Sequence, residues 1–255
     1  MRRREKFIIV SIVLSLALLA IQYVPLDWRY VAIVFLLITS YFAAVWALFA
    51  DLQAHEWLTI APFPALYASA VALFYFLLPE VFLSRLLVIA LFGIGMYALL
   101  LTSNIFSVAK GRTIQLLYAA HAVALFFIML TSLLFSNVIF SLRLAFYLNA
   151  ALIFVIHFPL VLSALWSIEL KSYLGKDLIL YALVFSLLMG ELAAVFSFLP
   201  MQIWNQALFL MSFLYVGLSV LQSFLKCRLF RNTLNEYNLV AFFMLLLFVL
   251  MFPLK

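Results

Sequence analysis

The feature that most constrains this chain is a succession of long apolar runs separated by short polar segments. A helix needs about 20 apolar residues to cross the hydrocarbon core of a bilayer, whereas barrel strands are shorter and alternate in hydrophobicity. The runs are continuously apolar, so the sequence predicts an all-α fold, a polytopic transmembrane helical bundle of about nine helices. The predicted spans are 7–24, 30–50, 58–78, 86–106, 113–135, 144–167, 178–199, 205–225 and 238–254.

Composition agrees with a membrane environment. Of the 255 residues, 70% are hydrophobic and 9% are charged. Soluble domains carry roughly 25% charged residues, so this chain has too little polar surface to cover a globule in water. The longest predicted loop, 226–237, is too short to form a domain. We therefore expect a single transmembrane domain over 1–255, no extramembrane domain, and the lipid bilayer as a partner.

Basic residues predict the orientation. With the N-terminus in the cytoplasm, the inner segments hold eleven Lys and Arg and the outer segments hold four. Cytoplasmic loops carry an excess of Lys and Arg, so we expect a cytoplasmic N-terminus and an external C-terminus. The basic segment 2–6 is interpreted as the start of an uncleaved first helix, because no small-x-small cleavage site precedes Pro25. The loop 51–57 has no Lys or Arg, which leaves open a re-entrant second and third span.

Two parts of the chain resemble each other. Residues 107–112 and 223–228 both read S-x-x-K-x-R, at the ends of the fourth and eighth spans. Tryptophans occupy similar places in the second and sixth spans, and prolines close the third and seventh. A four-plus-four duplication with a ninth helix added (4+4+1) would explain these matches. The alternative is that basic inner loops and prolines at helix ends are common, and we favour this alternative.

The charged and sulfur-containing residues exclude several classes of protein. The net charge is +6, but the basic residues form short clusters between apolar runs, so we expect no nucleic-acid partner. The single cysteine, Cys227, excludes an intrachain disulfide. The three histidines are scattered and no Cys/His pair has ligand spacing, so we expect no metal and no cofactor.

Three stretches in about the C-terminal two thirds of the chain are similar to a known family. They are T-S-N-I-F-S-V-A at 102–109, R-T-I-Q-L-L at 112–117 with A-H-A-V at 120–123, and G-E-L-A at 190–193 followed by F-L-P at 198–200. Together they resemble an uncharacterised family of small polytopic bacterial inner-membrane proteins. The resemblance implies a bacterial inner-membrane location. The family has no assigned activity, so the resemblance supplies no catalytic residues.

Glu191 is the most informative ionisable residue. It lies thirteen residues past the predicted inner start of the seventh span, which corresponds to a depth of about 20 Å. A charge inside the membrane costs about 2.5–3.5 kcal/mol on insertion scales, so such residues are often functional. Glu191 flanks a stripe of small residues, so we expect it to point into the bundle as a proton or cation site, or as a protonated carboxyl bonded to a neighbouring helix. The stripe comprises Ser186, Gly190, Ala193, Ala194 and Ser197.

A second intramembrane group lies in the sixth predicted span. His157 lies within about one helical turn of the depth of Glu191. Pro159 lacks an N–H and should free the carbonyl of Val155. Asn149 lies further out, on a neighbouring face. We expect His157 either to pair with Glu191 in a proton relay or, as we favour, to be satisfied by the freed carbonyl or a serine.

Polar residues also gather at the predicted cytoplasmic ends of the fourth and fifth spans. We call this region the cytoplasmic mouth. His121 lies in the fifth span, roughly 12 Å from its inner start. With it, Asn104, Lys110, Arg112 and Gln115 could form a pocket for an anion or a lipid headgroup. The alternative, which we favour, is ordinary anchoring at the membrane interface.

Catalytic motifs do not emerge from the sequence. His55-Glu56 begins like H-E-x-x-H, but Thr59 stands in place of the second histidine. We assign no catalytic residue, and this favours a protein that is not an enzyme. We expect a transporter-like protein, or a transport-complex membrane subunit with protein partners, whose polar intramembrane core lies between the fifth, sixth and seventh spans. The alternatives are a membrane enzyme or assembly partner acting on a lipid-linked substrate at the cytoplasmic face, and a purely structural membrane subunit.

Overall fold

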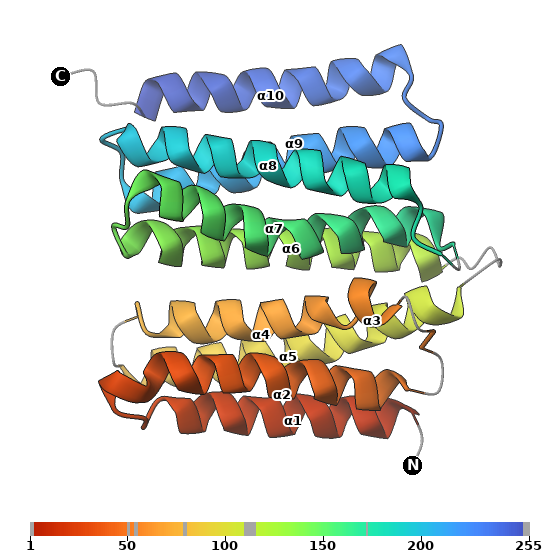
Figure 1. Cartoon of the computed structure of the whole chain (residues 1–255). Helices are drawn as coiled ribbons and strands as arrows, with labels where there is room; N and C mark the ends of the chain where they lie inside the picture. The colour runs from red at the N-terminus through yellow and green to blue at the C-terminus, as the bar shows by residue number, and fades with distance from the viewer. Residues whose placement is uncertain are drawn as a thin grey trace. The chain divides into compact units, whose positions relative to one another are not determined.

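The computed structural model describes residues 3–49, 52–53, 56–78, 81–109, 116–171 and 173–251. Within these ranges all regular structure is helical, as the continuous apolar runs predict (Figure 1). The helices are α1 Arg3–Ile21, the short 3₁₀ helix η1 Leu26–Trp28, α2 Arg29–Leu48, α3 Glu56–Thr59, α4 Pro62–Tyr75, α5 Phe82–Val108, α6 Leu116–Ser141, α7 Phe146–Glu169, α8 Lys176–Phe198, α9 Ile203–Leu225 and α10 Arg231–Met251.

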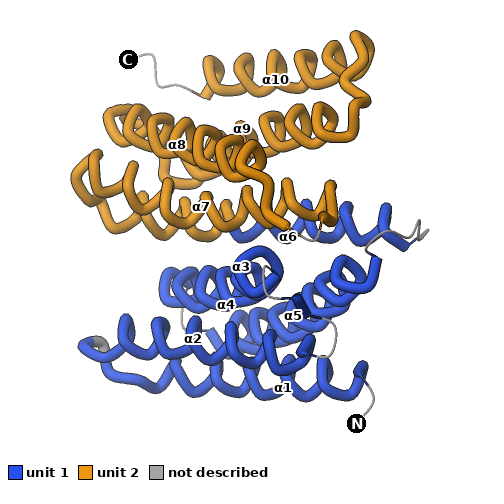
Figure 2. Tube along the Cα trace, turned by 45° about the vertical axis from the view of Figure 1, so that its right-hand side comes forward, with its two compact units in different colours: residues 1–131 blue, residues 132–255 orange. Residues whose placement is uncertain are grey.

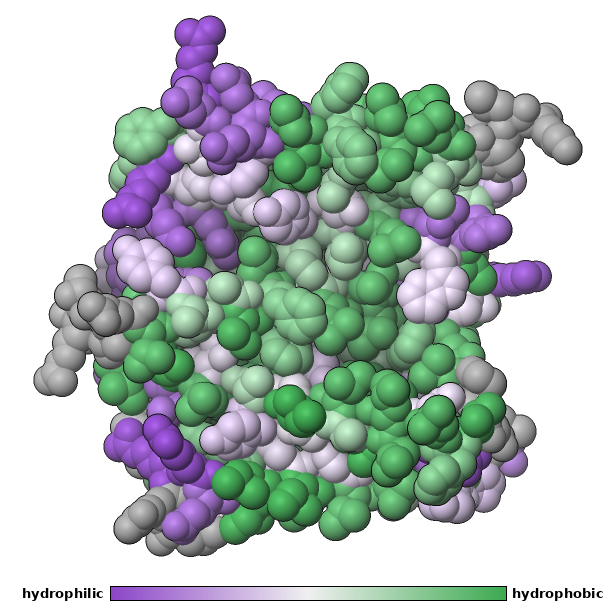
Figure 3. All heavy atoms as spheres, turned by 180° about the vertical axis from the view of Figure 1, so that it is seen from behind, coloured by the Kyte–Doolittle hydropathy of each residue, from purple (hydrophilic) through white to green (hydrophobic). Residues whose placement is uncertain are grey.

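Eight described helices are long and apolar enough to cross a membrane, with α3 and α4 counted together as Glu56–Tyr75. On the face shown in Figure 3, hydrophobic side chains cover the middle of the helices and hydrophilic ones gather toward their ends. This is the surface that a bilayer requires, because lipid contacts the middle of a span and water contacts its ends. The chain is therefore a multi-pass membrane protein.

The remaining predicted span corresponds to α1. It is also helical, but its first turn carries Arg3, Arg4, Glu5 and Lys6. These charges shorten the apolar part of the helix, so its crossing of the membrane stays a prediction.

The third predicted span is an interrupted helix. A turn of helix, α3, ends at Thr59, and α4 begins at Pro62 after two intervening residues. Proline is favoured in the first turn of a helix, where its missing N–H costs nothing, but it cannot donate to the carbonyl four residues earlier. The two prolines, Pro62 and Pro64, therefore explain why α3 does not continue into α4.

The chain forms two compact units, residues 1–131 and 132–255 (Figure 2). The boundary falls within α6, whose first part belongs to one unit and whose second part belongs to the other. A compact group of helices is not necessarily a separate domain, so the single transmembrane domain stays a prediction.

An aromatic cluster forms part of the core of the first unit. The Tyr67 side chain of α4 is 2% exposed. Its ring stacks on Phe92 of α5 at 5.6 Å between centroids and meets the edge of Phe127 of α6 at 5.3 Å. A Cβ atom at Gly95 would lie 2.9 Å from the Phe127 ring and would also collide with the Tyr67 hydroxyl. Gly95 therefore allows α5 to approach this cluster.

The second unit is dominated by the packing of α7 against α8, its most extensive helix pair. Gly190 of α8 is buried, and a Cβ atom there would lie 2.9 Å from the Ala150 carbonyl oxygen of α7. Small residues allow two helix backbones to approach closely, so the predicted stripe does mark a helix contact. At the edge of this unit, α10 packs on α9, and none of its described residues is buried.

The predicted duplication makes α7 the counterpart of α2 and α8 the counterpart of α4. Within the first unit α2 and α4 are the most extensively packed helix pair, and within the second unit α7 and α8 are, as the duplication would require. The tryptophans differ, because Trp166 is 1% exposed and donates to the Lys171 carbonyl, whereas Trp46 is 48% exposed under Lys6. The 4+4+1 arrangement thus stays a prediction.

Candidate functional site

His157 is the central group of the candidate site. It lies on α7 with 0% exposure. Its Nδ1 atom lies 2.8 Å from the Ile153 carbonyl oxygen, and its Nε2 atom lies 2.8 Å from the Ser132 hydroxyl oxygen on α6. A carbonyl oxygen only accepts, so Nδ1 carries the ring proton and Nε2 accepts from Ser132. The imidazole is therefore held as one neutral tautomer.

Two expectations for His157 need correction. The carbonyl that satisfies the ring is that of Ile153 and not that of Val155, although the expected serine partner is present. A ring on α7 reaches back to the residue four positions earlier, whereas a residue two positions earlier lies on the other side of the helix. The proposed pair with Glu191 is also wrong, because both ring nitrogens already have other partners.

Asn149, one of the predicted polar residues, links α7 to α8. It is 3% exposed, and its Nδ2 atom donates to the Ser197 hydroxyl at 3.0 Å and to the Leu144 carbonyl at 3.4 Å. Its Oδ1 atom is buried and has no hydrogen-bond partner among the described residues. Asn149 therefore retains one unused acceptor inside the bundle.

Two buried serines, one on α6 and one on α8, also retain unused groups. Ser136 follows Ser132 by one helical turn on α6, so both project from the same face. Ser136 and Ser186 of α8 are each 0% exposed, and neither hydroxyl finds a partner in the described part of the chain. Ser186 belongs to the predicted packing stripe, whereas no sequence pattern distinguishes Ser136 from other serines of the spans.

The packing of α7 on α8 gives the level of Ser186. The two helices run antiparallel, with Ser197 beside Asn149 and Gly190 beside Ala150 and Phe154. Ser186 lies four residues, or about one helical turn, before Gly190 on α8. Because the helices are antiparallel, this position lies about one turn further along α7 than the contact of Gly190. Ser186 therefore lies about level with His157. We call Ser132, Ser136, Asn149, His157 and Ser186 the polar core.

Glu191 is not part of this core. The side chain is exposed, contrary to the expectation that it points into the bundle. Consecutive helical residues are about 100° apart. Its neighbour Gly190 faces α7, but Glu191 is turned away from that contact and points out of the bundle.

The predicted cytoplasmic mouth is described only in part. Lys110, Arg112 and Gln115 lie outside the described residues. Asn104 is half-buried on α5, and its Oδ1 atom is buried without a partner in the described ranges. His121 is half-buried, and its ring contacts the Phe106 ring at 5.3 Å between centroids. The contact with Phe106 is compatible with either interpretation of this region, the pocket or interfacial anchoring.

A buried carboxyl that the sequence interpretation missed lies in the first unit. Glu56 at the start of α3 is 0% exposed. Its Oε2 atom accepts from the Gln53 backbone N–H at 2.8 Å and from the Ser107 hydroxyl of α5 at 3.2 Å. A Glu that reaches back three residues to a backbone N–H forms half of a capping box. The sequence signal is the spacing of Gln53 and Glu56, whereas the zinc motif concerns His55, Glu56 and Thr59.

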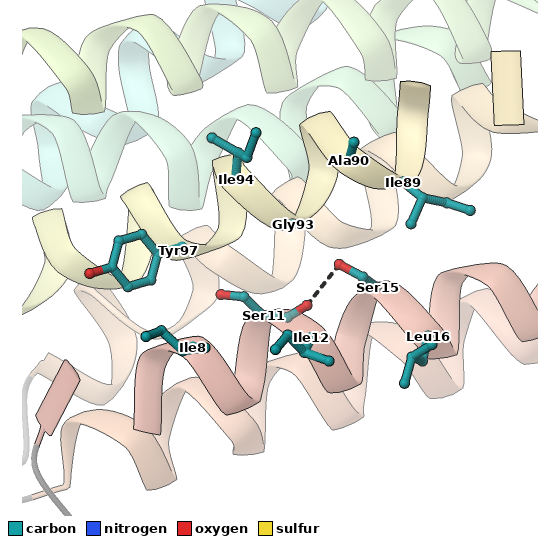
Figure 4. Close-up of a pocket in the computed structure, with 10 residues that line it drawn as sticks. All are labelled: Ile8, Ser11, Ile12, Ser15, Leu16, Ile89, Ala90, Gly93, Ile94 and Tyr97. Atoms are coloured by element: carbon teal, nitrogen blue, oxygen red, sulfur yellow. Dashed lines mark hydrogen bonds between the residues drawn. The ribbon is translucent and has the colours of Figure 1, made fainter. Parts of the chain in front are cut away.

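The surface grooves are apolar and separate from the polar core. A groove of about 490 Å³ runs between α1 and α5 beside Gly93 (Figure 4). Its two serines bond back to their own helix, Ser11 to the Phe7 carbonyl and Ser15 to the Ser11 carbonyl. The other described grooves lie along α8, α9 and α10, and none of these grooves includes His157. The side chains of the polar core are at most 3% exposed, so the core is enclosed in this conformation.

Fold and site together define a multi-pass helical membrane protein with an enclosed polar core of uncharged side chains. Comparisons with family models, curated proteins and solved structures found no match to this chain.

Proposed function

We propose that this chain is a transporter, or the membrane subunit of one, that moves a small polar solute without net charge through the polar core. The observation that carries the proposal is the set of unused hydrogen-bonding atoms on Ser136, Asn149 and Ser186, which are buried on the three helices α6, α7 and α8. A buried polar group without a partner costs about 1–3 kcal/mol. A solute that satisfies these groups as it passes would offset that cost.

The chemistry of the core supports an uncharged solute. The described buried polar residues of 132–255 are Ser, Asn, Gln and the neutral His157, with no carboxylate, Lys or Arg among them. An ion in a low-dielectric site needs a paired charge or strong ligands. Hydroxyl and amide groups can instead exchange hydrogen bonds with a neutral polar molecule.

The test uses purified protein in liposomes and stopped-flow light scattering after an osmotic shock. Water, glycerol and urea are the probes. We expect at least one to cross faster than in protein-free liposomes, and Ser136→Val and Ser186→Leu to remove the difference. Ser141→Val is the control, because the Ser141 hydroxyl bonds to carbonyls of its own helix, α6. If water, glycerol and urea all crossed no faster than in protein-free liposomes, the proposal would be contradicted.

A membrane enzyme is the second candidate, favoured by one observation. The Ser107 hydroxyl donates to the buried Glu56 carboxylate, which is the arrangement that activates a serine nucleophile. A fluorophosphonate probe should then label Ser107. Labelling should disappear in Ser107→Ala and fall in Glu56→Gln. Labelling that does not depend on Ser107 would remove this candidate.

A structural subunit is the remaining alternative. It would present a wide outer face of small or polar residues. The exposed residues of α2 and α5 are instead rich in large apolar side chains such as Phe35, Phe42 and Leu91. These faces suit lipid, so this alternative receives less support than transport.

A further inference from the structure

The carboxyl of Glu191 lies on the side of α8 opposite its buried face. Met189, two residues earlier, is 0% exposed. Two residues on a helix are about 200° apart, so Glu191 points almost directly away from the side that Met189 buries. Its neighbours on that outer side are Leu187 and Val195, which are 48% and 53% exposed. Glu191 is therefore surrounded by an apolar outer surface.

The outer face of α8 has the spacing of a helix–helix seam. Its residues recur at alternating intervals of four and three, as the a and d positions of a coiled coil do. Glu191 occupies an a position near the middle, and the other residues are apolar and exposed or half-buried. We call this face the Glu191 seam; it comprises Leu180, Val184, Leu187, Glu191, Ala194 and Phe198.

The depth of Glu191 requires a hydrogen-bonding partner. It lies seven residues before the last residue of α8, Phe198, which corresponds to about 10 Å along the helix. A glutamate side chain is too short to reach water from there, and water is absent from the hydrocarbon. Within the described part of the chain, Glu191 forms no hydrogen bond or ion pair. An intramembrane carboxyl in this position is costly unless another chain satisfies it.

We propose that the Glu191 seam is an interface between two copies of this chain, in which the two Glu191 carboxyls are protonated and hydrogen-bond to each other. Both copies insert with the same orientation, so a twofold axis along the membrane normal makes the two α8 helices parallel. An a position then faces the same a position of the partner. A protonated carboxyl has one donor and one acceptor, so two of them are complementary.

The chemistry of the chain favours a carboxyl partner over a cation. The described Lys and Arg of its membrane-crossing helices lie in the first helical turn, as Arg29 of α2 and Arg85 of α5 do. The described part of a second copy therefore offers no Lys or Arg at the depth of Glu191. It does offer the identical carboxyl at the identical depth.

Cysteine cross-linking tests the geometry in the full chain with Glu191 intact. In a Cys227→Ser background, single cysteines at Leu187 and Ala194 in liposomes are oxidised with copper phenanthroline. We expect both to form disulfide-linked dimers. The control is Val155→Cys on α7, which is 62% exposed and about level with Leu187 by the α7–α8 packing. Equal cross-linking of the seam and control positions, or none, would overturn the proposal.

Substitution of Glu191 tests the hydrogen bond. Single-molecule photobleaching in liposomes gives the dimer fraction as the lipid dilution increases. We expect Glu191→Leu to weaken dimerisation about tenfold, and Glu191→Gln to stay within about twofold of the parent because an amide also donates and accepts. If Glu191→Gln weakened dimerisation as much as Glu191→Leu, the carboxyl pair would be overturned. That result would point to a cationic partner chain. Cross-linking and photobleaching measure dimerisation and do not measure solute flux through the polar core. The dimer proposal and the transport proposal can therefore fail independently.

Discussion

The Ser132 hydroxyl of α6 donates to His157 Nε2 of α7 across 2.8 Å, at the centre of the polar core. The direction of this bond follows from the other ring nitrogen, which donates to the Ile153 carbonyl at 2.8 Å. The pair therefore couples two helices through one fixed tautomer. It also excludes the His157 ring from direct bonding to Glu191.

Removing the donor should destabilise the second unit. In Ser132→Ala, the buried Nε2 atom of neutral His157 loses its only described donor, and we expect a loss of about 1–2 kcal/mol in unfolding free energy. Unfolding in mixed detergent and dodecyl sulfate measures it. Ser11→Ala is the matched control, because its hydroxyl bonds only to the Phe7 carbonyl of its own helix. Equal losses of unfolding free energy in the two variants would contradict a stabilising hydrogen bond between Ser132 and His157.

Gly190 provides a test of the α7–α8 packing. Gly190→Ala would place a Cβ atom 2.9 Å from the Ala150 carbonyl oxygen, so the helix backbones must separate. We expect a loss of about 1–3 kcal/mol, and a larger one for Gly190→Leu. Gly175→Ala is the control, since nothing lies within 4 Å of its added Cβ. If Gly190→Ala were as stable as Gly175→Ala, the close approach of α7 and α8 would be wrong.

Asn149 and Ser197 should be energetically coupled. A double-mutant cycle with Asn149→Ala and Ser197→Ala isolates the hydrogen bond at 3.0 Å between them. Interhelical hydrogen bonds in a membrane average about 0.6 kcal/mol, and we expect a coupling of that size. Strictly additive losses of unfolding free energy would show that the two side chains do not bond in the membrane.

The spans were predictable from sequence because the bilayer sets their length. The runs predicted at 144–167 and 178–199 correspond to α7, Phe146–Glu169, and α8, Lys176–Phe198. The rotation of each helix was less predictable. A helix that is apolar on all sides gives little indication of its buried face. The small-residue stripe correctly predicted that Gly190 contacts another helix, but Glu191 lies about 100° further round.

The site was predictable only where residue chemistry alone indicates it. His157 and Asn149 are conspicuous because polar groups are rare in a span. Ser136 and Ser186 are not conspicuous, since a serine in a membrane helix often bonds to its own backbone. Their unused hydroxyls emerge only from the packing of α6, α7 and α8. Glu56 was missed because its burial depends on a local cap and on Ser107, 51 positions away.

The orientation of the chain is a separate prediction. The excess of Lys and Arg in the inner segments predicts a cytoplasmic N-terminus. Reporter fusions after Lys110, Lys176 and Lys226 should all give cytoplasmic signals. A fusion after Arg143, between α6 and α7, should give the opposite signal. A periplasmic signal at any of the first three positions would show that the predicted topology is wrong.

Access of water to the polar core tests the transport proposal most directly. In a Cys227→Ser background, Ser136→Cys and Ser186→Cys are exposed in liposomes to a small, uncharged, water-soluble thiosulfonate reagent. Ile139→Cys is the control, since Ile139 is a buried apolar residue on α6 at 3% exposure. We predict labelling of both core cysteines at least about tenfold faster than of the control, because a transport route must open to water. Labelling of both core positions as slow as that of Ile139→Cys would contradict a route through the core.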